Sequence, residues 1–210
     1  MRAPGSNWGA TAAEREMPLP CDELAPDPAV TCHRAISVGA PVPVTFRRLC
    51  QLRAAPYSYD LLDNFGHPSP VELTPGLDRL EAGQRFMRIF RLVSFDATRI
   101  TLRAERTFVT YAVVTDGPEG SGSRILVRVR FGPETRLGGA LAHLLVLGDL
   151  VMMRKQLLTL RDLAERDAAA LGIDTAGIER RRPRLRSNPG VDAAQINAAA
   201  PSGRCDRTPT

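Results

Sequence analysis

The chain has 210 residues, of which 43% are hydrophobic, a length and composition that fit one globular domain with tails. Its formal net charge is +5, and residues 171–210 account for +3 of it, because they hold seven arginines against four acids. The other 170 residues carry only +2, so the charge gives no indication of a basic groove for nucleic acid.

Residues 1–28 are rich in alanine, proline, glycine and acids and show no periodicity. They are therefore expected to form a disordered leader. Residues 29–38 alternate between apolar and polar side chains, which predicts a strand. The apolar face of this strand carries Val30, Cys32, Ile36 and Val38.

Two short helices are expected after this strand. Pro41 and Pro43 are typical of a first helical turn, and the apolar stripe that follows predicts a helix up to about residue 53. Its solvent side carries Arg47, Arg48 and Gln51. Residues 57–65 begin with capping residues and end before a glycine, which predicts the second short helix.

From residue 84 to residue 131 the chain has the pattern of strands separated by turns. Four strands are predicted, at residues 84–93, 99–105, 107–115 and 123–131. The second is expected to turn Thr101 outward, the third is apolar on both faces, and the fourth alternates apolar residues with arginines. Because consecutive strands joined by short turns run antiparallel, these segments predict an antiparallel sheet.

The longest helical pattern in the chain runs from residue 138 to residue 165. Between residues 140 and 153 only His143 and Asp149 interrupt an apolar run, so this half is expected to be enclosed on nearly all sides. The second half has one apolar stripe and a charged opposite side. The stripe consists of Leu150, Met153, Leu157, Leu160 and Ala164. Residues 171–210 are expected to form a disordered basic tail.

Several kinds of site and compartment can be assessed from spacing alone. The four cysteines form no CxxC pair, which argues against a zinc site or a redox motif. The sequence has no GxSxG, Walker or HExxH motif and no clustered metal ligands, so neither a metal nor a cofactor is expected.

The apolar run at residues 137–153 is short and contains an aspartate, which favours a buried helix over stable membrane insertion. No signal-peptide pattern is present, and a reducing cytoplasm is the expected location.

Two stretches of the chain are similar to the START/Bet v 1-like (SRPBCC) superfamily, which is also described as polyketide cyclase/dehydrase and lipid transport-like. Residues 54–64, AAPYSYDLLDN, resemble the aromatic segment between the two small helices of bacterial members. Residues 148–157, GDLVMMRKQL, and residues 160–165 resemble their closing helix. The resemblance covers about residues 29–167 and implies little about activity, because members of such a fold differ in function.

This resemblance implies an α+β helix-grip domain at residues 29–170. In such a domain an antiparallel sheet wraps around a long C-terminal helix, and two short helices follow the first strand. It also implies a cavity between the sheet and the long helix. Candidates for its lining are Tyr57, Tyr59, Asp60, Phe86, Arg88, Phe90, Phe108, Tyr111, Arg128, His143, Leu147, Leu150 and Met153.

Most of these candidates would serve equally well as ordinary core, and the sequence leaves both interpretations open. Tyr59 and Asp60 could hold a polar ligand atom, or Asp60 could simply cap a helix. His143 could be a core histidine or an acid/base catalyst. Asp149 is unusual in an apolar half-helix, and we expect an arginine of the sheet, Arg88 or Arg128, to pair with it.

The sequence therefore predicts that the chain binds a hydrophobic or amphipathic small molecule, lipid-like or polyketide-like, under its C-terminal helix. One alternative is a cyclase or aromatase in which Tyr59, Arg88 and His143 orient and protonate the substrate. Another is a homo-oligomeric module, such as a homodimer, without a ligand. Its contact surface would consist of Leu141, Leu144, Leu145 and Met152.

Overall fold

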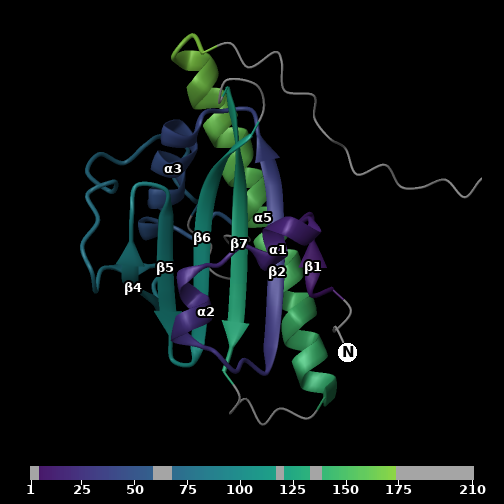
Figure 1. The fold of residues 1–210 in the computed structure, drawn as a ribbon. Coiled ribbons are helices and arrows are strands. Elements are labelled where there is room, and N and C mark those ends of the chain that lie inside the picture. The colour runs from purple at the N-terminus through teal and green to yellow at the C-terminus, as the bar shows by residue number, and fades with distance from the viewer. Residues whose placement is uncertain (1–4, 59–67, 117–120, 133–138, 174–210) are drawn as a thin grey trace, which may run out of the picture. The chain divides into compact units, whose positions relative to one another are not determined.

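The structure is a computed structural model that describes residues 5–58, 68–116, 121–132 and 139–173, with only the backbone of residues 139–147. Within these residues seven strands form one sheet in the order β1-β2-β7-β6-β5-β4-β3 (Figure 1). β1 runs parallel to β2, and the other neighbouring strands are antiparallel. The strands are β1 (Asn7–Trp8), β2 (Val30–Val38), β3 (Arg85–Phe86), β4 (Phe90–Phe95), β5 (Arg99–Ala104), β6 (Thr107–Asp116) and β7 (Gly122–Phe131).

The described helices lie on both sides of this sheet. They are α1 (Ala12–Glu16), α2 (Pro20–Leu24), α3 (Val42–Cys50), the short 3-10 helix η1 (Gln51–Arg53) and α5 (Gly139–Ala170). The predicted α+β class is confirmed, with a mainly antiparallel sheet and a long C-terminal helix. The second short helix, predicted at residues 57–65, and the tail beyond residue 173 lie outside the described residues.

The apolar stripe of α5 is buried as predicted, with Met153, Leu157, Leu160 and Ala164 in the core cluster and Leu150 half-buried. The helix ends in a Schellman motif. Gly172 has a φ of +70°, the Ile173 amide donates to the Ala168 carbonyl at 3.0 Å, and Ile173 packs against the core. This end therefore fixes the last turn of α5 to the body of the domain.

The expected all-round enclosure of residues 140–153 is wrong at the positions whose side chains the structure describes. Val151 is 53% exposed and Met152 is 37% exposed. Val151 lies opposite the buried stripe of α5 and Met152 lies at its flank. The apolar run in the sequence therefore does not mean that this part of the helix is enclosed on all sides. Leu141, Leu144 and Leu145, which the homo-oligomer alternative also needs, lie where side chains are not described.

Residues 5–28, which we call the N-terminal segment, form β1, α1 and α2 in place of the expected disordered leader. A capping box begins α1, because the Glu14 amide donates to the Thr11 hydroxyl and the Thr11 amide donates to the Glu14 carboxylate. Leu19 and Cys21 are buried against residues of β2, β6 and β7. Short capped helices and single buried residues leave no sequence periodicity, which is why the pattern did not reveal them.

The two faces of the sheet therefore have different covers (Figure 1). We call the face that packs with α5 the inner face; it carries Cys32, Tyr111 and Val127. The outer face carries Ala35, Ala112 and Leu126 and is covered by the N-terminal segment. A double cover explains why β6 is apolar on both faces, as the sequence indicated.

The predicted strand at residues 84–93 is instead a hairpin of β3 and β4. The connection at residues 87–89 has positive φ at Met87 (+45°) and Arg88 (+65°). Turns of this kind usually contain glycine or asparagine. Their absence made the segment look like one continuous strand.

Two polar residues of the α3–η1 region that were expected in solvent are buried. Arg48 forms an ion pair with Asp167 of α5 and donates to the Val71 carbonyl at 2.9 Å. Gln51 exchanges two hydrogen bonds with the backbone of Thr74. The irregular segment around residues 71–74 therefore covers this side of the helix, and its contacts satisfy both side chains.

Candidate functional site

An ion pair lies between the inner face and α5. Arg34 of β2 is fully buried, and its Nη2 donates to Oδ2 of Asp149 at 2.8 Å. Its Nη1 donates to the His33 carbonyl at 3.0 Å, while its buried Nε has no hydrogen-bond partner in the part of the chain that is described. A buried guanidinium with an unused donor is costly unless something else uses that donor.

Asp149 is therefore paired with Arg34, and the predicted partners Arg88 and Arg128 are wrong. Burial raises the pKa of the Asp149 carboxyl, and the nearby Arg34 guanidinium opposes that rise. The sequence analysis missed Arg34, which interrupts the apolar face of β2 between Cys32 and Ile36. A charged residue in that position was itself the available signal.

A second polar group lies on the same stripe of α5, since Asp149, Met153 and Gln156 are spaced by four and three residues. The Tyr111 hydroxyl donates to Oε1 of Gln156 at 2.8 Å. Gln156 Nε2 in turn donates to the Pro56 carbonyl at 2.6 Å and lies 3.2 Å from the Met87 sulfur. Burial raises the pKa of Tyr111 far above its ordinary value, so its hydroxyl remains a donor.

Gln156 joins two places where the backbone is strained. Tyr57, which follows Pro56, has a φ of +55°, and Met87 has a φ of +45°. Such conformations in residues other than glycine cost on the order of 1–3 kcal/mol each and often occur at functional sites. Gln156 was not predicted, although a polar residue in the apolar stripe from Met153 to Leu157 was visible in the sequence.

The structure brings several predicted residues together at this place. Tyr57, Phe86, Tyr111 and Met153 are buried in one core cluster, and Phe90 packs against it. Arg88 is in the turn beside Met87, and Leu150 is half-buried on α5. Tyr59, Asp60 and the side chains of His143 and Leu147 lie outside the described residues, and the cyclase alternative depends on two of them.

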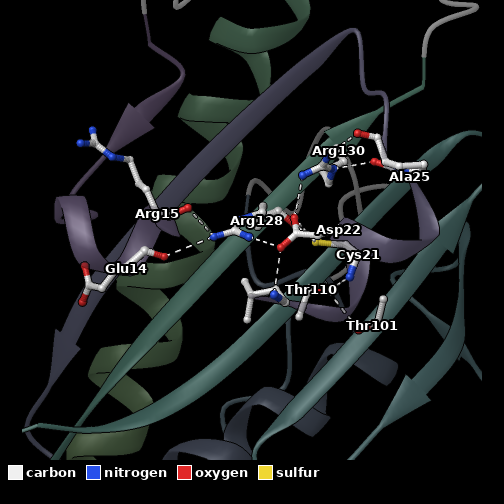
Figure 2. Close-up of polar contacts among 11 residues, drawn as sticks. Glu14, Arg15, Cys21, Asp22, Ala25, Thr101, Thr110, Arg128 and Arg130 are labelled. Carbon is white, nitrogen blue, oxygen red and sulfur yellow. Dashed lines mark hydrogen bonds and ion pairs between the residues drawn. The ribbon is translucent and has the colours of Figure 1, made fainter. Parts of the chain in front are cut away.

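Arg128 and Phe108 do not line the inner face. Phe108 packs with the outer cluster, next to Ala112 and Leu126. Arg128 points from β7 toward the N-terminal segment, where it forms an ion pair with Asp22 and donates to the Arg15 carbonyl at 2.8 Å (Figure 2). The position of Arg128 follows from strand alternation, because its neighbours Val127 and Val129 occupy the inner face.

The rest of the outer contact is also polar (Figure 2). Asp22 accepts from Nη1 of Arg130 at 2.7 Å, and Arg130 donates to the Ala25 carbonyl at 2.7 Å. The Cys21 amide donates to the hydroxyl of Thr110, which is hydrogen-bonded to Thr101. Thr101 is thus buried under the N-terminal segment, and it is not exposed as the sequence suggested.

The described thiols are poor nucleophiles. Burial raises the pKa of Cys32 to about 11 and that of Cys50 to about 12, and it also raises the pKa of Cys21. All three therefore remain protonated near neutral pH. Among the described residues there is also no group of three His, Cys, Asp or Glu side chains that could hold a metal ion.

We expect iodoacetamide at pH 8 to alkylate Cys32 at least about a hundredfold more slowly in the folded protein than in urea, since the thiolate is the reactive form. Peptide mass spectrometry after timed quenching measures this rate separately for Cys32 and Cys50. Equal rates with and without urea would show that these thiols are open to solvent.

Comparison with known proteins identifies no family. No protein-family model and no curated protein matches the chain. One solved structure that resembles it is the crystal structure of TTHA0849 from Thermus thermophilus. It has 16% sequence identity and a TM-score of 0.35, and the alignment covers 67% of this chain and 98% of that one. A likeness at this level carries no conclusion about the present chain.

None of the described helices is long and apolar enough to cross a membrane.

Proposed function

We propose that the domain is a helix-grip fold that binds a hydrophobic or amphipathic small molecule between the inner face and α5. The observation that carries the proposal is the buried pair of Arg34 and Asp149, with an unused donor, inside a mainly apolar interface. Small-molecule sites typically combine apolar walls with a few placed polar groups.

Stability alone does not account for these polar residues. A buried ion pair is often no more stabilising than apolar residues of similar volume, because both charges lose their hydration. Gln156 likewise uses its hydrogen bonds on a tyrosine, a backbone carbonyl and a methionine sulfur. Polar groups that add little to stability, beside strained backbone at Tyr57 and Met87, favour a binding role.

The proposal can be tested with the full chain and the neutral fluorescent probe N-phenyl-1-naphthylamine. We expect saturable binding with one probe per chain. Native mass spectrometry of protein purified from its own host would add the chemical class of any molecule that co-purifies. Absence of saturable probe binding up to the solubility limit of the probe would overturn the proposal.

Two tryptophan substitutions on α5 locate the site. Met153→Trp fills the interface and is expected to weaken probe binding at least about tenfold, because added bulk occupies the ligand's space. Val151→Trp is the matched control on the exposed side of the same helix and should leave affinity unchanged. Thermal unfolding shows whether each variant is folded. Equal affinities for both folded variants would place the bound probe elsewhere on the protein.

A further inference from the structure

We infer that the ligand presents a neutral hydrogen-bond acceptor, such as a ketone, ester or alcohol oxygen, to Arg34, in preference to a carboxylate. The inference rests on the proposed function and specifies the polar end of the ligand. It is carried by two features of the site, namely which hydrogen-bonding groups remain unused and how the charge of Arg34 is balanced.

The unused group is a donor. Arg34 has only donors, and its Nε is buried and without a partner in the described part of the chain. The nearby Tyr111 hydroxyl already donates to Gln156, and both ends of the Gln156 amide are occupied. The ligand atom that satisfies this site is therefore an acceptor, and an oxygen is the usual one.

The charge of Arg34 is already balanced. A guanidinium stays protonated inside a protein. Asp149 lies within 2.8 Å of it, and with Asp149 ionised the pair has no net charge. A ligand carboxylate at Nε would add a second negative charge beside Asp149 in a place shielded from water, and would leave the site with a net charge of −1. A neutral oxygen uses the same donor without that charge.

Trp8 of β1 is the cross-strand neighbour of Arg34, and Arg154 of α5 stacks on it, with the Arg154 Cζ 5.7 Å from the ring centroid. Arg154 is exposed, so solvent screens its charge from the Arg34–Asp149 pair. Cys32 on the same strand, Tyr111 on the inner face and Met153 on α5 are buried in the core cluster of this interface. Burial raises the pKa of Cys32 to about 11 and that of Tyr111 higher still, so both are neutral. The electrostatics thus favour an uncharged polar group at this position.

The test compares two ligands with the same chain, methyl dodecanoate and dodecanoate, as competitors of N-phenyl-1-naphthylamine. At pH 8, well above the ordinary pKa of a carboxyl group, we expect the ester to compete at least about tenfold more strongly. Equal or stronger competition by dodecanoate would overturn the inference while leaving the proposed function intact. Failure of the probe itself to bind would instead refute the proposed function, so the two failures are distinguishable.

Asp149→Asn is expected to shift the preference from the ester toward the carboxylate, because it removes the negative charge of Asp149 and leaves the Arg34 charge unbalanced. In this variant dodecanoate should gain at least about tenfold relative to the ester. A gain by neither ligand in a folded variant would contradict the role given to Asp149.

A double variant keeps the test decisive if Asp149→Asn does not fold. Arg34→Met with Asp149→Leu removes the pair together, a change that folded proteins often tolerate. The ester should then bind about fivefold more weakly than to the unmodified protein, as expected for one lost hydrogen bond. The probe has no oxygen, so the loss is measured as a fall in the affinity of the ester relative to that of the probe. An equal loss for both would show that Arg34 shapes the site without contacting the ligand's polar atom.

Discussion

Replacing Asp22 with alanine is expected to lower the free energy of unfolding by about 3 kcal/mol or more. Asp22 accepts from Arg128 and Arg130 of β7, and it also accepts from the Leu19 amide at the start of α2. Its removal leaves the Arg128 charge almost fully buried without a counterion. Truncating one partner of a buried pair is costly for this reason. Urea unfolding followed by circular dichroism measures the change.

Asp78→Ala is the matched control for this prediction. Asp78 and Arg47 form an ion pair at 4.0 Å in which both side chains are largely exposed. Solvent screening limits such a pair to a few tenths of a kcal/mol. If the Asp22 and Asp78 variants lost the same small amount of stability, the contact between the N-terminal segment and β7 would be a surface contact in solution.

The strand and helix periodicities of residues 29–173 were readable because they repeat over many residues. The alternation in β7 placed Ile125, Val127 and Val129 on one face, and the structure buries them there. The stripe of α5 was equally clear, because several apolar positions in succession at helical spacing are typical of a helix with one buried face. In a pattern of this length, one atypical residue does not change which secondary-structure element is predicted.

The candidate site was harder to predict because its members are the exceptions to those patterns. Arg34 and Gln156 each occupy a position at which the periodicity predicts an apolar residue. Their partners lie 115 and 45 residues away, at Asp149 and Tyr111. A sequence alone does not say which of several arginines reaches a given aspartate, and here Arg88 and Arg128 were reasonable but wrong.

The N-terminal segment was missed for a different reason. Its helices have five residues each, which is too short for a buried stripe. Many of its contacts with the sheet are made by backbone carbonyl groups, which leave no signal in the amino-acid sequence. Arg124, Arg128 and Arg130 donate to backbone oxygens of this segment as well as to its acids. The sequence analysis assigned Arg128 to the cavity lining, whereas all three arginines form the contact that holds the outer cover.

Gly9→Ala is expected to lower the free energy of unfolding by about 3 kcal/mol, a size that few single substitutions reach. Gly9 has a φ of +77°, and a Cβ built there would lie 2.0 Å from the Ala35 carbonyl oxygen. This oxygen belongs to the backbone of β2 and has little freedom to move. The N-terminal segment must therefore shift away from the sheet, which also disturbs the hydrogen bond from Arg124 to the Gly9 carbonyl.

Gly76→Ala separates the clash from the backbone conformation. Gly76 has nearly the same φ, +78°, but a Cβ there would meet nothing within 4 Å. Its loss should be about 1 kcal/mol, the cost of a left-handed conformation for alanine. The difference between the two variants, measured by urea unfolding, then reports the close approach of the N-terminal segment to β2. Equal losses would mean that this segment yields to one extra methyl group, and the outer cover would then be too loosely held for Asp22 to have the effect expected above.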